Sequence, residues 1–113
     1  MITIYHNPRC GKSRTCVMHF DALNVPYTVV RYLEHPLTEA ELKKVLNLLA
    51  IRPIDLVRTK EKIWIEQFQN KIMSDDAIIQ AMVLYPILIE RPIVINNDKA
   101  VIARPLERIQ EIL

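Results

Sequence analysis

The chain has little of several features that mark specialised classes of protein. Its 113 residues include one glycine and two cysteines, and no apolar run approaches the roughly 18 residues that a membrane span needs. Two cysteines are too few for a disulfide scaffold, so we expect a protein of the reducing cytoplasm. The formal net charge is only +2, too small to indicate a nucleic-acid surface. We therefore expect no membrane partner and no nucleic-acid partner.

Patterns typical of metal and nucleotide sites are missing as well. The three histidines, His6, His19 and His35, are scattered, and no Cys/His spacing fits a zinc site. No glycine-rich loop is present that would cradle a phosphate. These shortages predict a protein with no metal and no bound cofactor.

The residues that are present predict one α/β domain over residues 1–113. Half of them are apolar and a quarter are charged, as in an ordinary globular protein with a single core. Residues 2–5 are β-prone, and residues 27–33 form a β-branched and aromatic strand. Between them, residues 11–24 predict a helix that buries Cys16, Phe20 and Leu23 on one face.

The middle of the chain predicts helices. Thr38 and Glu41 have the spacing of a capping box, and Ser74 precedes a second helix start. The charged stretch 52–71 predicts shorter helices. The expected buried stripes are Leu42, Val45, Leu46 and Leu49 in the first helix, and Ile78, Ala81, Met82 and Tyr85 in the second.

The last third changes period and predicts a β-hairpin followed by a helix. Residues 93–95 and 100–103 read as strands joined by the turn 96–98, and Pro105 suits the first position of a helix burying Leu106, Ile109 and Ile112 or Leu113. The full order is β-α-β, a helical insertion, then β-β-α. That order resembles a thioredoxin-like domain with a mixed four-stranded sheet.

Cys10 is the candidate nucleophile, because it lies between the first strand and the first helix. A thiol at a helix N-terminus faces unpaired backbone N–H groups and the positive end of the helix dipole, which favour the thiolate. Arg9, Lys12 and Arg14 raise the positive potential around it. Cys16 lies on the predicted apolar stripe, so we expect it to be a core residue with no redox role.

Several separate motifs carry a resemblance to a known family. They are the run from Tyr5 to Cys10 (Tyr-His-Asn-Pro-Arg-Cys) with Ser13-Arg14, then Tyr32-Leu33-Glu34, the stretch from Pro86 to Val94, and Ala103-Arg104-Pro105. In this order they resemble the arsenate reductase family that draws electrons from glutathione and glutaredoxin. The chain is similar to its short members that carry Asn-Pro-Arg-Cys.

The resemblance implies roles for six residues and two partners. Cys10 would form a covalent adduct with arsenate, with His6 and Ser13 favouring its thiolate. From the residues alone, His6 fits a strand-end histidine bonded to the backbone equally well. Ser13, from the residues alone, is better explained as an ordinary helix-terminus residue. Glutathione would be the co-substrate and glutaredoxin the protein partner. The oxyanion would be held by Arg58, Arg91 and Arg104, whose planar guanidinium groups donate paired hydrogen bonds.

Two further expectations follow from this resemblance. Thioredoxin-like domains carry a cis-proline before the hairpin, so the Arg91–Pro92 bond is predicted to be cis, whereas Arg52-Pro53 is interpreted as structural. Two other functions stay open: a thiol–disulfide oxidoreductase acting on another substrate, and a polymerase-binding redox regulator. Redox-switch regulators of the second kind carry Cys-x-x-Cys, and here Ser13 stands three residues after Cys10.

Overall fold

The computed structural model describes all 113 residues, which divide into two compact units. Unit 1 comprises residues 1–35 and 91–113, and unit 2 comprises residues 36–90. The prediction of one domain over residues 1–113 stays a prediction.

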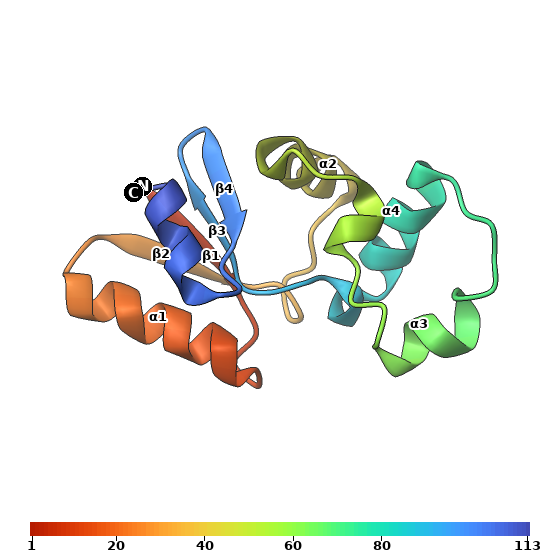
Figure 1. Ribbon diagram of the computed structural model, residues 1–113, viewed down its shortest axis with the longest axis horizontal. Coiled ribbons are helices and arrows are strands. Elements are labelled where there is room, and N and C mark those ends of the chain that lie inside the picture. Colours follow the sequence, from red (N-terminus) through yellow and green to blue (C-terminus); the bar gives the residue numbers. More distant parts are fainter. The chain divides into compact units, whose positions relative to one another are not determined.

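Unit 1 is built on a mixed four-stranded sheet (Figure 1), as the sequence predicted. Its strands are β1 (Ile2–His6), β2 (Tyr27–Arg31), β3 (Ile93–Asn96) and β4 (Lys99–Ile102), in the spatial order β2-β1-β3-β4. Strand β1 pairs with β2 in parallel and with β3 antiparallel, and β3 pairs with β4 antiparallel.

The strand boundaries differ from the predicted ones by one or two residues. Strand β2 ends at Arg31 because the backbone N–H groups of Glu34 and His35 both donate to the Arg31 carbonyl, which closes a turn over Tyr32 and Leu33. The hairpin is tighter than predicted, since Asn96 pairs with Lys99. Asn97 in that turn has φ of 57°, a left-handed conformation that asparagine tolerates better than most residues.

Helix α1 (Gly11–Leu23) buries its apolar stripe in the core of unit 1. Cys16 and Phe20 are fully buried there, in a cluster that includes Ile4 and Val94 of the sheet. The prediction that Leu23 is buried is wrong, because 44% of it is exposed. Leu23 is the last residue of α1, and the chain turns away through Asn24 in the left-handed region.

The closing helix is a 3₁₀ segment, η3 (Leu106–Glu111), and not an α-helix. Three residues per turn place Ile109 and Ile112 on one side, and both are buried in the core of unit 1. Pro105 precedes the helix and is not its first residue, and Leu106 is only half-buried. The side chain of Asn96 donates to the Ile112 carbonyl at 2.7 Å, which ties the end of the chain to β3.

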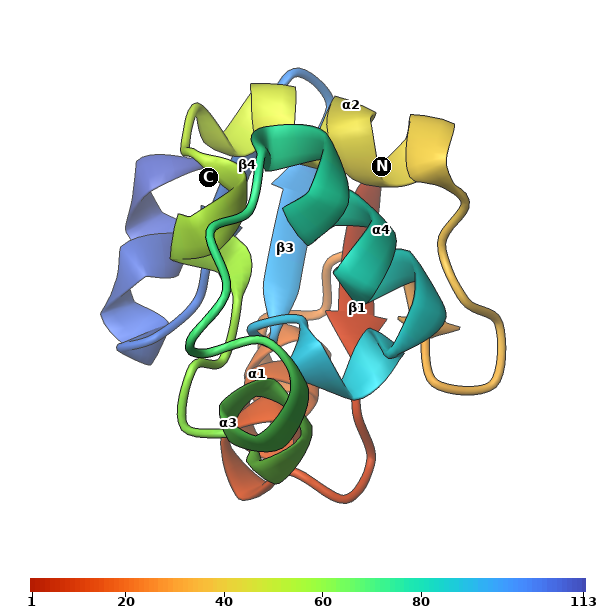
Figure 2. The same ribbon diagram turned by 90° about the vertical axis from the view of Figure 1, so that its right-hand side faces the viewer.

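Unit 2 is the predicted helical insertion (Figure 2). Leu42, Val45 and Leu46 of α2 are buried as predicted, as are Ile78, Ala81 and Met82 of α4, whereas Leu49 and Tyr85 are only half-buried. None of the helices is long and apolar enough to cross a membrane. The elements are α2 (Glu39–Leu49), η1 (Pro53–Leu56), α3 (Lys62–Gln67), α4 (Asp75–Leu84) and η2 (Pro86–Leu88).

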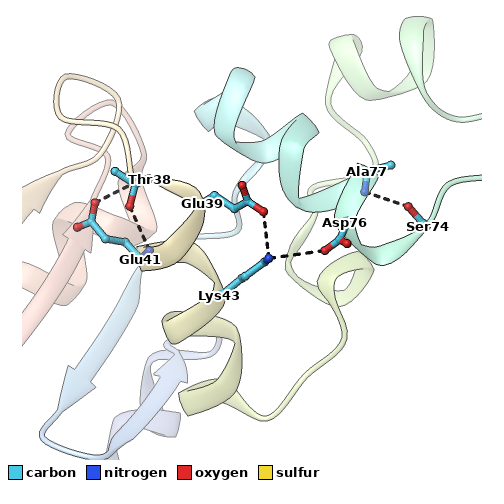
Figure 3. A network of polar contacts seen from close by, with 7 residues as sticks. All are labelled: Thr38, Glu39, Glu41, Lys43, Ser74, Asp76 and Ala77. Atoms are coloured by element: carbon cyan, nitrogen blue, oxygen red, sulfur yellow. Dashed lines mark hydrogen bonds and ion pairs between the residues drawn. The ribbon is translucent and has the colours of Figure 1, made fainter.

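The two longer helices of unit 2 begin with side-chain caps (Figure 3). The Thr38 hydroxyl accepts from the Glu41 N–H at 3.2 Å, and a Glu41 carboxylate oxygen accepts from the Thr38 N–H at 3.0 Å. This is the predicted capping box. The Ser74 hydroxyl accepts from the Ala77 N–H in the same way at the start of α4.

Candidate active site

Cys10 is the N-cap residue of α1, at the end of the loop that follows β1. Its N–H donates to the Asn7 carbonyl at 3.0 Å, and its carbonyl accepts from the Arg14 N–H at 3.0 Å. No side chain caps this helix start, and its first turn contains no acidic residue. The N–H groups of the first turn are therefore free to act on the Cys10 sulfur.

The surroundings of Cys10 favour its thiolate. Desolvation is the largest single effect and raises the pKa of the thiol, but the opposing effects together outweigh it and the pKa is lowered overall. The backbone N–H of Ser13, the side chain and positive charge of Arg91, and the N–H of Lys12 produce this lowering. These are the groups that activate cysteines at helix starts. Cys10 as a residue is only partly buried, in contrast to the second cysteine of the chain.

Arg91 is a buried guanidinium next to this sulfur. Only 7% of the residue is exposed, and its Nε and Nη1 make no hydrogen bond within the protein. A buried N–H without a partner is costly, so such groups in a native protein call for a functional explanation. Arg104 lies beside it, with Nη1 3.3 Å from the Arg91 carbonyl oxygen. The fold therefore brings two of the three predicted arginines together.

His6 and Ser13 lie close together, and their side chains are hydrogen-bonded to each other. The Nδ1 of His6 and the Ser13 hydroxyl share a hydrogen bond of 2.6 Å, and this hydroxyl also accepts from the Asn7 N–H at 3.0 Å. All three residues are buried. Ser13 therefore acts on Cys10 through its backbone N–H, while its side chain holds the end of β1 to the start of α1.

The environment of His6 favours the neutral form of its imidazole. Burial lowers its pKa, and the charges of Arg31 and Arg14 lower it further. A neutral imidazole does not add positive charge near the thiolate. Its contribution to the site is the hydrogen bond to Ser13.

Asn7 is a residue of this loop that the sequence analysis did not single out. Its carbonyl accepts from the Cys10 N–H, its N–H donates to the Ser13 hydroxyl, and its Oδ1 accepts from the Arg9 N–H at 3.0 Å. The signal was its place before Pro8, since an asparagine side chain that bonds to the backbone two residues on is typical of turns. Asn7 fixes the loop that carries the nucleophile.

The second cysteine has the opposite character, as predicted. Cys16 is fully buried in the core of unit 1, and burial raises the pKa of its thiol to about 11. A thiol that stays protonated at neutral pH is a poor nucleophile. The two sulfurs of the chain therefore differ in both exposure and ionisation.

Arg58, the third predicted arginine, belongs to unit 2. Its backbone N–H donates to the Leu88 carbonyl at 2.7 Å. Its guanidinium contacts Glu61 at 2.9 Å and Glu90 at 3.3 Å. The side chain is therefore held between two carboxylates within its own unit.

The remaining predictions about this region have mixed outcomes. The Arg91–Pro92 bond is cis as predicted, and Arg104–Pro105 is a second cis bond that was not predicted. Arg14 is exposed and donates from Nη1 to the Pro8 carbonyl at 2.9 Å. The structure brings together no group of three or more His, Cys, Asp or Glu side chains that could hold a metal ion. The roles of the predicted site residues stay predictions.

Comparison with known proteins identifies the family. The ArsC family model matches residues 5–112. The chain belongs to the ArsC family. It is 38% identical to the arsenate reductase of Neisseria meningitidis serogroup A, over 99% of this chain and 97% of that protein. It is 37% identical to the arsenate reductase of Escherichia coli K12, over 99% of this chain and 80% of that protein.

The solved structure of a protein named as an arsenate reductase has the same fold. The arsenate reductase from Vibrio cholerae superposes with a TM-score of 0.93 at 38% identity, covering 99% of this chain and 97% of that one. The predicted fold, an α/β thioredoxin-like chain with a mixed four-stranded sheet, is thereby confirmed.

Proposed function

We propose that this protein reduces arsenate to arsenite, with Cys10 as the nucleophile, glutathione as the reductant and glutaredoxin as the partner that restores the enzyme. The observation that carries the proposal is a cysteine of lowered pKa at an uncapped helix start beside a buried arginine. Family membership supports the choice of substrate, because several relatives are named arsenate reductases.

Arginine side chains bind the oxyanion in this proposal. A guanidinium group keeps its charge at any working pH and donates two parallel hydrogen bonds to a tetrahedral anion. The unpartnered Nε and Nη1 of Arg91 are donors of this kind, and Arg104 lies against the Arg91 main chain. We assign Arg58 the same role, with Glu61 and Glu90 holding its guanidinium in place.

The first chemical step forms a bond between sulfur and arsenic. The Cys10 thiolate attacks the arsenic of dihydrogen arsenate, and one As–O bond breaks. With one proton taken up, that oxygen leaves as water and a thiol–arsenate adduct remains. No electrons have yet been transferred to arsenic. A lowered thiol pKa supports this step, because more of the sulfur is ionised at neutral pH.

The second step transfers two electrons. A glutathione thiolate attacks the Cys10 sulfur, an S–S bond forms and the S–As bond breaks with its electron pair on arsenic. With two protons taken up, arsenic(V) leaves as arsenous acid, and Cys10 and glutathione share a mixed disulfide. A glutaredoxin thiolate then takes the glutathione and releases Cys10 as a good leaving thiolate. Both electrons come from thiols, so the cycle needs no bound metal or organic cofactor.

His6 and Ser13 position the nucleophile in this cycle. The Ser13 N–H donates to the thiolate, and the bond between the Ser13 hydroxyl and His6 fixes the first turn of α1 against the end of β1. Asn7 supports the same loop from its other side.

A single-turnover assay with arsenate, glutathione and glutaredoxin tests the proposal. Cys10→Ser should lower arsenite formation by at least about 10³-fold, as expected for loss of a nucleophile. Cys16→Ala is the matched control and should keep wild-type turnover, because Cys16 is buried and protonated. Wild-type turnover by Cys10→Ser would overturn the mechanism. Efficient turnover of a glutathione mixed disulfide with no arsenite formed would favour a thiol–disulfide oxidoreductase, and capture of RNA polymerase subunits without turnover would favour a regulator.

A further inference from the structure

A pocket of about 530 Å³ lies at the carboxyl ends of the two parallel strands of unit 1. Strand β1 ends at His6 and β2 ends at Arg31, and these two residues are paired in the register of the strands. In open α/β sheets, ligands usually bind outside the carboxyl ends of the strands. Cys10 and Arg91 do not line this pocket. Its lining residues are His6, Val17, Val29, Val30, Arg31 and His35.

The charge in and around this pocket is positive. Arg31 lines it, and burial followed by the charges of Arg31 and Arg14 lowers the pKa of His6. No carboxylate lines the pocket. Glu34 lies 3.7 Å from the Arg31 guanidinium, but both side chains are more than half exposed, so this ion pair is weak. The pocket therefore favours an anion.

His6 supplies a hydrogen-bond donor on the side of its ring that faces away from Ser13. The buried Ser13 hydroxyl accepts from the Asn7 N–H, and its only other partner is Nδ1 of His6. A buried hydroxyl needs an acceptor for its own proton, so Ser13 donates to Nδ1 and the proton of the neutral imidazole lies on Nε2. Nε2 makes no hydrogen bond within the protein and is not cut off from solvent. An anion in the pocket can accept from it.

The remaining lining of the pocket is apolar. Val29 pairs with Ile4, and Arg31 pairs with His6, so these four side chains lie on one face of the sheet. Val17 of α1 packs against the core on that face. Val29 is two residues before Arg31, which places the valines about 7 Å from the charged end of the strand. A ligand that contacts both has a negative group and a short apolar part.

We propose that this pocket binds a carboxylate that carries a short alkyl chain. The carboxylate faces Arg31, His35 and Nε2 of His6, and the chain packs against the valines. A planar carboxylate accepts two parallel hydrogen bonds from a guanidinium group. The volume of the pocket and its mixture of apolar walls with a few polar groups are typical of small-molecule sites. Arsenate has no apolar part, so the proposal does not depend on the proposed function.

Binding of hexanoate to the intact protein tests the pocket, with the NMR methyl signals of Val17 and Val29 as the readout. Acetate supplies the charge alone and hexanol supplies the chain alone. Each should bind at least about 10-fold more weakly than hexanoate, because one set of contacts is lost. Equal affinity for hexanol would overturn the anion site, and equal affinity for acetate would overturn the apolar part. Tighter binding of phosphate than of hexanoate would also overturn the proposal.

Two variants test the residues that carry the proposal. Arg31→Gln should weaken hexanoate binding about 5-fold, as expected for loss of an exposed ion pair. Val29→Thr replaces one methyl group with a hydroxyl group and should weaken hexanoate binding about 3-fold, with acetate binding unchanged. Arg9→Gln is the control, because Arg9 lines the neighbouring cavity with Arg31 and Glu34 but not this pocket. An equal loss in Arg9→Gln and Arg31→Gln would contradict the proposal.

Two further measurements place the ligand and separate this proposal from the proposed function. Hexanoate should raise the pKa of His6, followed by NMR, because a carboxylate beside the ring favours the imidazolium form. An unchanged pKa would show that the ligand does not reach His6. Cys10→Ser should bind hexanoate with wild-type affinity, and arsenate should not displace it. Displacement by arsenate would place hexanoate in the active site and overturn the pocket, whereas the turnover assay alone decides the proposed function.

Discussion

Helix α1 of unit 1 and helices α2 and α4 of unit 2 begin in opposite ways. Thr38 and Ser74 cap α2 and α4 with their hydroxyl groups, and acidic residues occupy the first turn of each (Figure 3). Helix α1 has a cysteine at the N-cap, no side-chain cap and no acidic residue in its first turn. The same backbone donors therefore stabilise the fold in unit 2 and are available to a sulfur anion in unit 1.

The difference shows how the chain separates stability from reactivity. A side-chain cap contributes about 1 kcal/mol to a helix, and an acidic residue in the first turn adds some tenths more. Helix α1 has neither of these stabilising contributions. Its free N–H groups instead help to lower the pKa of Cys10.

Among the changes that test this comparison, the largest expected effect comes from removing Arg91, the buried cation beside the start of α1. Arg91→Ala should lower kcat/KM for arsenate on the order of 10²-fold, as is usual when one charged donor to an oxyanion is lost. The pKa of Cys10 should rise, because Arg91 lowers it. Kinetics and a pH series of iodoacetamide alkylation measure the two effects. Arg9→Ala is the control, since Arg9 is exposed, and an equal loss in both variants would argue against Arg91 as an anion ligand.

Ser13→Ala should destabilise the start of α1 without abolishing the activation of Cys10. The variant leaves the Asn7 N–H and His6 Nδ1 buried without this partner, which costs about 1–3 kcal/mol. The donor to the thiolate is the backbone N–H, which alanine retains. Urea unfolding and alkylation kinetics test both statements, with the exposed Thr15→Ala as the control. A Cys10 pKa returned to the value of a free cysteine would show that the hydroxyl itself activates the thiol.

The caps of unit 2 should affect stability alone. Thr38→Ala and Ser74→Ala should each lower the free energy of unfolding by about 1 kcal/mol. The alkylation rate of Cys10 should remain that of the wild type, because these helix starts lie in the other unit. Slower alkylation in either variant would contradict the separation of stability from reactivity.

The smallest expected effect comes from making α1 begin like α2 and α4. Gly11→Asp places an acidic residue in the first turn, where it should stabilise the helix by about 0.3–1 kcal/mol and raise the pKa of Cys10. A Cβ at Gly11 meets only Arg14 Nη2, at an ordinary 3.6 Å, so the change fits. Gly11→Asn is the neutral control. Equal alkylation rates in the two variants would show that the charge of the first turn does not act on the sulfur.

Local patterns in the sequence predicted much of this architecture. The cap at Thr38, the helix start after Cys10 and the burial of Cys16 depend on neighbouring residues, and all three are confirmed. The wrong predictions concern the boundaries of elements: the end of α1 at Leu23, the end of β2 at Arg31 and the start of η3 after Pro105. The residue at which an element begins or ends depends on a local turn or on where the packed core stops. The periodicity of apolar residues does not indicate that position.

The contacts between distant residues could be predicted only in part. The resemblance predicted Arg91 and Arg104 as site residues. The contact of Arg104 with the Arg91 carbonyl could not be predicted, because it depends on the hairpin that joins the two residues. The direction of the Ser13 hydroxyl toward His6 depends on how β1 and α1 meet. No spacing rule gives that direction, so the sequence left the roles of these two residues open.

The pH dependence of Cys10 alkylation in a Cys16→Ala background tests the central claim most directly. The alkylation rate follows the thiolate fraction, so it rises with pH through the pKa and is constant above it. We predict that the midpoint of this pH curve lies lower in the folded protein than in the same chain unfolded in urea. We also predict that arsenate changes the midpoint of the folded protein. A folded midpoint equal to or above the unfolded one, unchanged by arsenate, would contradict the account.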